Sequence, residues 1–174
     1  MDDPGLIAPV DDRWFEDYVP GSVGVFGGIA ITEQEIVGFA RHYDPQAIHA
    51  DPEAARTGPF GGLIASGWHT IALVMRVLVD NYLSHVAALV SPGIDELRWL
   101  APVCPGDTLT VRVTVTEAVP SRSKPDRGLV KSFVEAMNQR GEIVLTMKAM
   151  NLMRRREPGS RGNARAASRG PARE

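Results

Sequence analysis

The chain has 174 residues, of which 44% are hydrophobic, 23% charged and 6% aromatic, and its formal net charge is −2. This length predicts one domain with enough apolar side chains for a packed core, which excludes a collagen-like or wholly disordered chain. The single cysteine, Cys104, excludes an internal disulfide framework and favours a reducing compartment.

The first twenty residues are acidic and irregular, and we interpret them as an N-terminal extension whose Trp14, Phe15 and Tyr18 pack on the domain. They contain no apolar run typical of a secretion signal. The longest apolar stretch of the chain, over 71–79, is interrupted by Arg76 and is too short to span a bilayer. We therefore expect a soluble, cytoplasmic protein with no membrane partner.

The next segments alternate between strand and helix signals. An apolar, glycine-rich stretch over 23–31 predicts a bulged or closely packed strand. Thr32, followed three residues later by a glutamate, predicts a helix start, and this helix should end before Pro45 because the residue before a proline avoids the α region. Asp51 followed by Pro52 predicts a second, short helix.

The second half of the chain predicts one long helix followed by strands. Ser66 can cap a helix over 67–83, which is apolar almost all round and should therefore be enclosed by other structure. Strands are predicted over 93–100, 109–116, 129–138 and 143–153, the last two joined as a hairpin. This order predicts an α+β fold in which a curved antiparallel β-sheet is wrapped around one long central helix. Because such a sheet leaves an edge exposed, we expect a homodimer or a dimer-based oligomer.

The C-terminal residues 154–174 differ sharply from the rest. They contain seven Arg, two Glu and no large apolar side chain, whereas residues 1–153 contain twelve Lys or Arg and nineteen Asp or Glu. Such a segment predicts a basic, disordered tail. A basic arm can bind nucleic acid, but this one has no interleaved aromatic residues and follows no nucleic-acid-binding fold. A solvated terminus is the preferred interpretation, with no nucleic-acid partner.

Asp44 and His49 are the first candidates for chemistry. They lie five residues apart in a predicted non-helical loop stiffened by Pro45. A carboxylate and an imidazole that reach one water molecule suit a hydration or dehydration, in which one group takes a proton from water and the other supplies a proton to carbon. Alternatively, Asp44 forms a turn before the proline and His49 is an ordinary polar loop residue, which spacing alone favours.

Gly67, at the start of the long helix, is the second candidate. The first amides of a helix have no partner within it and carry the positive end of its dipole. A residue without a side chain there would let a substrate oxygen approach those amides, as in an oxyanion hole. The alternative is close packing of the helix start against a strand, which is the commoner reason for a glycine at this position.

Three motifs together resemble a known family. The segments Y-D-P-Q-x-x-H-x-D, F-G-G-L-I-A-S-G and A-P-V-C-P-G-D-T-L are similar to those of the MaoC-like dehydratases, the (R)-specific enoyl-CoA hydratases of the hotdog fold. The resemblance covers residues 21–153, and the last motif indicates only the fold. It implies an enzyme that adds water reversibly and syn to a 2-enoyl-CoA, giving a 3-hydroxyacyl-CoA.

The same resemblance implies roles for individual residues. Asp44 and His49 fall on the catalytic pair that holds the water, and Gly67 falls on the glycine whose amide receives the thioester oxygen. Gln46 stands where the family commonly has Asn, and Ser66 stands where it commonly has His. Because of these two differences, the resemblance implies the reaction class more directly than it implies the substrate. The bulky Trp68 would narrow the acyl pocket. The expected substrate-binding residues are therefore Gln46, Ser66, Gly67 and Trp68.

The remaining candidates carry less weight. His69 lies two residues after Gly67 and could face the same pocket, although such residues more often pack or cap. His42, His85 and Cys104 are interpreted as structural. No cluster has metal-ligand spacing and no dinucleotide fingerprint is present, so neither a metal nor a cofactor is predicted.

Two other functions remain open. A hotdog acyl-CoA thioesterase would direct the water at the thioester carbonyl, and the histidine five residues after the aspartate favours hydration over this reaction. A non-catalytic acyl-binding subunit that pairs with an active chain would need neither of the two side chains.

Overall fold

The computed structural model describes residues 8–156, and the predictions for the earlier residues and for 157–174 fall outside this range. The described strands form one antiparallel five-stranded sheet in the order β1-β3-β4-β5-β2. Their bounds are β1 Val23–Ala30, β2 Ala88–Trp99, β3 Thr108–Pro120, β4 Arg127–Met137 and β5 Ile143–Arg154. The helices are α1 Glu33–Tyr43, α2 Ala47–Ala50, α3 Pro52–Arg56 and α4 Gly67–Asn81, with short 3-10 turns over Val10–Asp12 and Phe15–Asp17.

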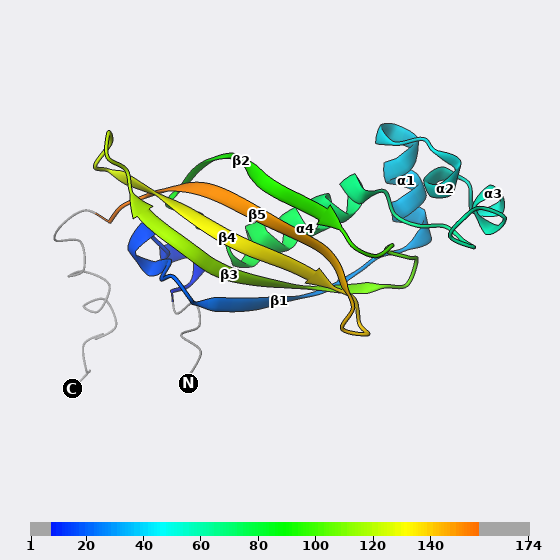
Figure 1. The fold of residues 1–174 in the computed structure, drawn as a ribbon, viewed down its shortest axis with the longest axis horizontal. Helices are drawn as coiled ribbons and strands as arrows, with labels where there is room; N and C mark the ends of the chain where they lie inside the picture. Colours follow the sequence, from blue (N-terminus) through cyan, green and yellow to red (C-terminus); the bar gives the residue numbers. More distant parts are fainter. Residues whose placement is uncertain (1–7, 157–174) are drawn as a thin grey trace, which may run out of the picture.

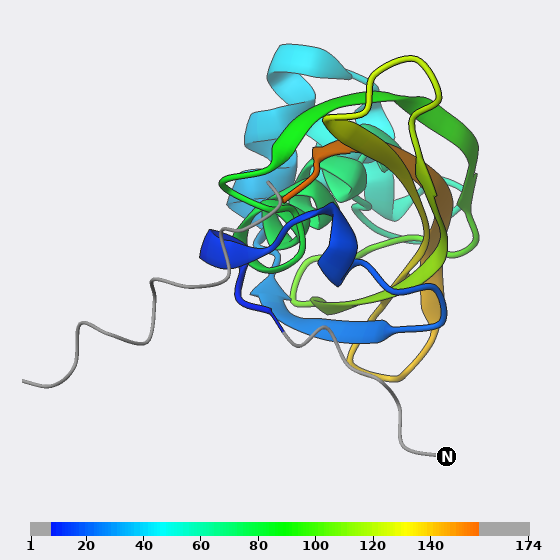
Figure 2. The same ribbon diagram turned by 90° about the vertical axis from the view of Figure 1, so that its left-hand side faces the viewer.

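The sheet curves around α4, as the order of elements predicts (Figure 2). Buried and less buried positions alternate along β3 and β4, so one face of these strands is buried. The centre of the core is formed by the valines of that face, Val111, Val113, Val115, Val130 and Val134. Val74, Val77 and Leu78 of α4 are buried in the same core. Period-two burial of β-branched side chains on one face is the pattern expected of a half-buried sheet.

One face of α4 is not enclosed, which corrects the prediction of a helix covered on all sides. Trp68 is 62% exposed, Met75 46% and Val79 40%, and these residues follow one another at helical spacing along α4. The sheet therefore covers the helix from one side, and a row of apolar side chains faces outward in the single chain.

The strand β2 begins earlier than predicted. It starts at Ala88 instead of residue 93, and its pairing with β5 is irregular around Val90 and Gly93. Pro92 lies in this irregular part, and β2 is an edge strand, where a proline costs no ladder hydrogen bond on its free side. The predicted bulge in the first strand is confirmed, since the pairing of β1 with β3 shifts between Gly27 and Ile29.

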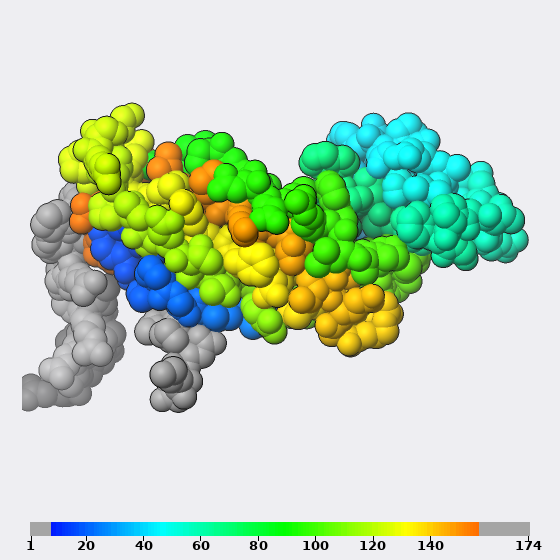
Figure 3. Space-filling model, in the orientation of Figure 1, coloured from blue at the N-terminus to red at the C-terminus, as the bar shows by residue number. Residues whose placement is uncertain are grey.

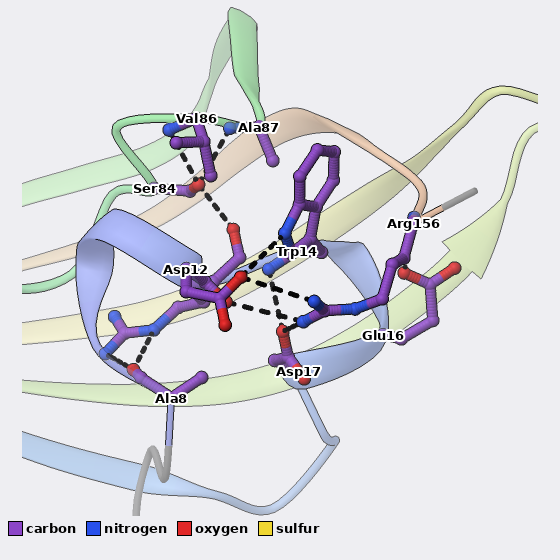
Figure 4. Close-up of polar contacts among 10 residues, drawn as sticks. Ala8, Asp12, Trp14, Glu16, Asp17, Ser84, Val86, Ala87 and Arg156 are labelled. Carbon is purple, nitrogen blue, oxygen red and sulfur yellow. Dashed lines mark hydrogen bonds and ion pairs between the residues drawn. The ribbon is translucent and has the colours of Figure 1, made fainter. Parts of the chain in front are cut away.

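The two ends of the described chain pack together (Figure 4). Phe15 and Tyr18 are buried, as predicted for the N-terminal extension. Arg13 donates hydrogen bonds to the carbonyls of Asn81 and Tyr82, where α4 ends. Arg156 donates to Asp17 at 2.8 Å, so the first residues of the predicted disordered tail are in fact placed by ion pairs that composition does not reveal.

No helix between residues 8 and 156 is long and apolar enough to cross a membrane. The helices α1, α2 and α3 gather at one end of the sheet, opposite the end where the described chain begins and ends (Figure 1), and they protrude beyond the sheet in the space-filling view (Figure 3).

Candidate active site

Asp44 and His49 are placed by a helix end and a single helical turn. Asp44 is the C-cap of α1, and its backbone amide donates to the Ala40 carbonyl. After Pro45 the chain forms α2, which contains His49, so the predicted non-helical loop is wrong at this point. Hydrogen bonds from the amides of residues 49–51 to the carbonyls of Gln46 and Ala47 close this turn once the proline has been passed.

The two side chains face each other. The Nε2 atom of His49 lies 3.6 Å from Oδ2 of Asp44, and the two side chains are only 8% and 18% exposed. The other ring nitrogen, Nδ1, lies 2.9 Å from the carbonyl oxygen of Ile64. A carbonyl can only accept, so in the neutral ring Nδ1 carries the proton and Nε2 presents a lone pair toward Asp44.

Two side chains hold the Asp44 carboxylate. The Gln46 amide donates to Oδ1 and the Ser66 hydroxyl donates to Oδ2, both at 2.7 Å. These hydrogen bonds, with the one from Gln46 first in importance, keep the pKa of Asp44 below its usual value. The carboxylate thus accepts from side chains and does not form the local turn that was the alternative interpretation.

Ser66 and Gly67 form the start of α4 beside this pair. The Ser66 hydroxyl also accepts a hydrogen bond from the Trp68 amide at 3.3 Å, as a helix N-cap does. Among the described residues, the Gly67 amide has no acceptor, as expected for the first position of a helix.

Trp99, at the end of β2, explains why residue 67 is a glycine. Its indole Nε1 donates to the Gly67 carbonyl at 3.0 Å. A Cβ atom added to Gly67 would lie 2.5 Å from Cε2 and Nε1 of the Trp99 ring. Close packing against a strand, the alternative considered for this glycine, is therefore present, and it leaves the amide free on another side.

A cavity of about 440 Å³ joins these groups. Its polar lining comprises Asp44, His49, Ser66 and Thr70, close to the start of α4, and the rest is mostly apolar. The apolar lining comprises Ile48, Phe60, Ile64, Ala65, Trp68 and Trp99 together with the segment Leu100–Val103. An apolar pocket with a few convergent polar groups is the usual form of a small-molecule site.

The other sequence candidates lie outside this cavity. His69 is buried and stacks on Phe39 at 4.7 Å between ring centroids, so it packs α4 against α1. Its burial keeps its pKa below the usual value. His42 contacts the Gly38 carbonyl, and His85 pairs with Asp11 far from the cavity.

Cys104 lies outside the cavity, close to Asp107. Burial, followed by the nearby Asp107 carboxylate, raises the pKa of the Cys104 thiol, which does not favour a nucleophile. Within residues 8–156, no three His, Cys, Asp or Glu side chains converge as metal ligands.

Sequence reasoning missed Trp99 and Thr70 as lining residues. Thr70 lies one helical turn after Ser66 and could have been found from helical spacing. Trp99 is 32 residues from Gly67 and reaches it only through the fold, so no local signal pointed to it.

The chain is similar to known proteins in sequence and in fold. A family profile described as a MaoC-like domain matches residues 20–136. A MaoC-like dehydratase from Rhodospirillum rubrum is 40% identical, with a TM-score of 0.78 over 84% of this chain and 99% of that one. The R-hydratase PhaJ1 from Pseudomonas aeruginosa is 26% identical, with a TM-score of 0.66 over 83% and 86%.

A further relative is similar in sequence and is also named as a dehydratase. The 3-hydroxyacyl-thioester dehydratase Z of Mycobacterium tuberculosis is 35% identical over 114 residues, which cover 64% of this chain and 73% of that protein. With the sheet that curves around α4, the structural likenesses confirm the predicted hotdog fold.

Proposed function

The chain belongs to the MaoC-like dehydratase family, and from this we propose that it adds water reversibly and syn to a 2-enoyl-CoA thioester, giving a 3-hydroxyacyl-CoA. The relatives named as dehydratases and hydratases support this reaction class. The single observation that carries the proposal is the pair formed by Asp44 and His49, 3.6 Å apart at the wall of an apolar cavity.

Asp44 and His49 would hold the attacking water through both of its O–H groups. The Asp44 side chain is an ionised carboxylate and Nε2 of His49 carries a lone pair, so both groups accept hydrogen bonds. A water that donates to both directs its own lone pair at C3 of the enoyl group. Asp44 holds no proton to give, in contrast to the expectation that one of the two residues takes a proton and the other supplies one.

A single base therefore suits this geometry. As the oxygen bonds to C3, His49 takes one water proton at Nε2, and the adjacent Asp44 carboxylate stabilises the imidazolium. The electron pair of the double bond moves toward the thioester oxygen, and the imidazolium then returns its proton to C2. Because the oxygen and the proton arrive from the same side, the addition is syn.

The start of α4 would stabilise the enolate. Negative charge gathers on the thioester oxygen while the proton is in transit, and the Gly67 amide at the positive end of α4 is free to donate to it. Removing one such donor typically raises a barrier by about 2.7–4 kcal/mol.

Two substitutions test the proposal directly. We expect Asp44→Asn and His49→Ala each to lower kcat/KM for hydration of crotonyl-CoA by roughly 10²–10⁴-fold, measured as loss of absorbance of the conjugated double bond. Asp51→Asn is the matched control, because Asp51 caps α3 and lies outside the cavity. Full activity in either site variant, or release of free CoA in place of hydration, would refute the proposal.

The homodimer is also part of the proposal. Val90 and Ile94, on the edge strand β2, are 59% and 46% exposed, so this edge is apolar as well as free, and the outward row of α4 is a second exposed apolar surface. Exposed apolar patches and free sheet edges mark sites of association. A second copy of this chain would cover both.

A charge placed on this face tests the dimer. We expect Met75→Glu to shift the protein from dimer to monomer in sedimentation velocity, because a carboxylate would be buried without a partner. Val25→Glu is the control, since Val25 is 59% exposed on β1, the opposite edge of the sheet, and Met75 is 46% exposed. A wild-type monomer, or loss of the dimer in the control alone, would contradict this assignment.

A cytoplasmic location completes the proposal. Cys104, the cysteine of the chain, is free. A free thiol suits a compartment in which thiols stay reduced.

A further inference from the structure

Two tryptophans from different elements meet at the cavity. Trp68 lies in the first turn of α4, and Trp99 is the last residue of β2. Their rings touch edge to face, with centroids 5.8 Å apart and planes at 73°. Both rings line the cavity that contains Asp44 and His49. We call these two residues the tryptophan pair.

Trp99 is bound to the start of α4, and Trp68 packs against it. The indole of Trp99 donates to the Gly67 carbonyl at 3.0 Å and packs where a side chain of residue 67 would be. An edge-to-face contact orients Trp68 against Trp99, and such contacts contribute about 0.5–1.5 kcal/mol. The pair therefore forms an apolar wall beside the amide end of α4.

The charges around the cavity limit what can bind against this wall. Asp44 and His49 are the ionisable side chains that line the cavity, and none of its lining residues among those described is Lys or Arg. His49 already faces the Asp44 carboxylate. A second carboxylate, carried by the acyl chain of a ligand, would lie near a negative charge without a cation to pair with it. Burying an unpaired charge is costly.

We propose that the tryptophan pair is the specificity determinant of this site and that it selects thioesters whose acyl chain is uncharged. The inference rests on the proposed function, because it assigns the acyl chain of the thioester to this cavity. It goes beyond that function in excluding carboxylated acyl chains.

Binding of two saturated thioesters with four-carbon acyl groups tests the selection. Butyryl-CoA and succinyl-CoA share the CoA moiety and differ by a terminal carboxylate, and neither has a double bond to hydrate. By titration calorimetry of the full chain, we expect succinyl-CoA to bind about tenfold more weakly than butyryl-CoA, or worse. A smaller ratio, or no binding of butyryl-CoA, would overturn the inference.

A cation introduced into the wall tests the role of the pair. Trp68 is 62% exposed in the single chain, so Trp68→Arg should fold, and its guanidinium would lie at the cavity edge. Because Trp68 also belongs to the row that the proposed dimer covers, Met75→Glu, which carries a charge in the same row but outside the cavity lining, is measured beside it and should keep the wild-type ratio. We expect the preference for butyryl-CoA to fall by roughly fivefold or more, since a charge–carboxylate pair is formed. Trp99→Arg is the second variant. Val25→Arg adds the same charge on the exposed edge of β1 and should leave the ratio unchanged.

The outcomes separate this inference from the proposed function. If both Trp→Arg variants fold, as their circular dichroism reports, and keep the wild-type ratio, the tryptophan pair is not the determinant. Hydration of crotonyl-CoA by the same preparation reports on the proposed function alone. An active hydratase that binds succinyl-CoA as tightly as butyryl-CoA would refute only the inference, and a selective binder that hydrates nothing would refute only the proposed reaction.

Discussion

Each oxygen of the Asp44 carboxylate accepts one side-chain hydrogen bond, from Gln46 on one side and Ser66 on the other. These donors favour the charged form, so Asp44 stays ionised as the pH falls past its ordinary pKa of 3.8. Gln46 and Ser66, the two positions where the chain departs from the commoner family residues, thus both act on the same carboxylate. The departure preserves a charged acceptor beside His49.

Removing one of these donors should shift the titration of the Asp44 carboxyl group. In Ser66→Ala the carboxylate loses the hydroxyl, so the pKa of Asp44 rises toward its usual value and the carboxylate is protonated at a higher pH. We expect the carboxyl carbon chemical shift of Asp44, followed by NMR, to titrate at a higher pH than in the wild type, with a stability loss of about 1 kcal/mol from the missing helix cap.

Thr32→Ala separates the two effects of the serine. Thr32 caps α1 with the same kind of hydrogen bond and does not contact Asp44. It should lose a similar stability, about 1 kcal/mol in urea unfolding, while Asp44 titrates as in the wild type. An unchanged titration of Asp44 in Ser66→Ala would contradict the assigned role of the hydroxyl.

At the scale of elements, α4 and β2 meet where Trp99 covers Gly67. Gly67→Ala keeps the amide but places a methyl group into the Trp99 ring, so the helix start and the strand end must move apart. We expect kcat/KM for crotonyl-CoA to fall by roughly tenfold or more, since small misplacements of positioning groups are costly. The matched control is Gly62→Ala, where nothing lies within 4 Å of the added atom, and it should keep its activity. Equal activity in the two variants would remove the positioning role of this contact.

Local signals were enough to predict the elements whose cause is local. The capping residues Thr32, Ser66 and Asp51 each begin a helix at the predicted place, because a cap depends on residues only two or three positions away. The alternation over 109–116 likewise predicted β3. The turn α2 was missed because four residues are too few to show a helical period.

The site depends on contacts that no local signal reports. The resemblance brought Asp44, His49 and Gly67 together as candidates, and the fold places them around one cavity. Ser66 lies 22 residues from Asp44 along the chain, and Trp99 lies 32 residues from Gly67. No local sequence pattern indicates that residues so far apart form a hydrogen bond. The apolar residues of the outward row on α4 predict a buried surface, because apolar periodicity does not distinguish a core from an interface.

On the scale of the whole molecule, the candidate site and the two ends of the described chain lie at opposite ends of the sheet (Figure 1). At the end away from the site, Arg156 lies between Asp12 and Asp17 and faces the Trp14 ring at 5.6 Å from its centroid (Figure 4). The N-terminal segment bound in this way contains Arg13, whose side chain donates to the carbonyls at the end of α4. Among the described residues, acidic side chains near the start of the chain therefore pair with a basic side chain near its end.

Arg156→Ala should lower stability and leave catalysis unchanged, because the ion pairs it removes lie at the end of the sheet opposite the cavity. Arg156 and Asp17 are only 17% and 20% exposed, so their pair should contribute more than a surface pair, with the Trp14 contact adding to it. We expect a loss of about 1–2 kcal/mol in urea unfolding at low ionic strength and a smaller loss in 1 M NaCl, where charges are screened. Arg56→Ala removes an exposed pair with Glu53 and should cost less than about 0.5 kcal/mol. If Arg156→Ala instead lowered kcat/KM at unchanged stability, the two ends of the molecule would be coupled through α4, because Arg13 binds the carbonyls at the end of this helix and its first residue, Gly67, lines the cavity.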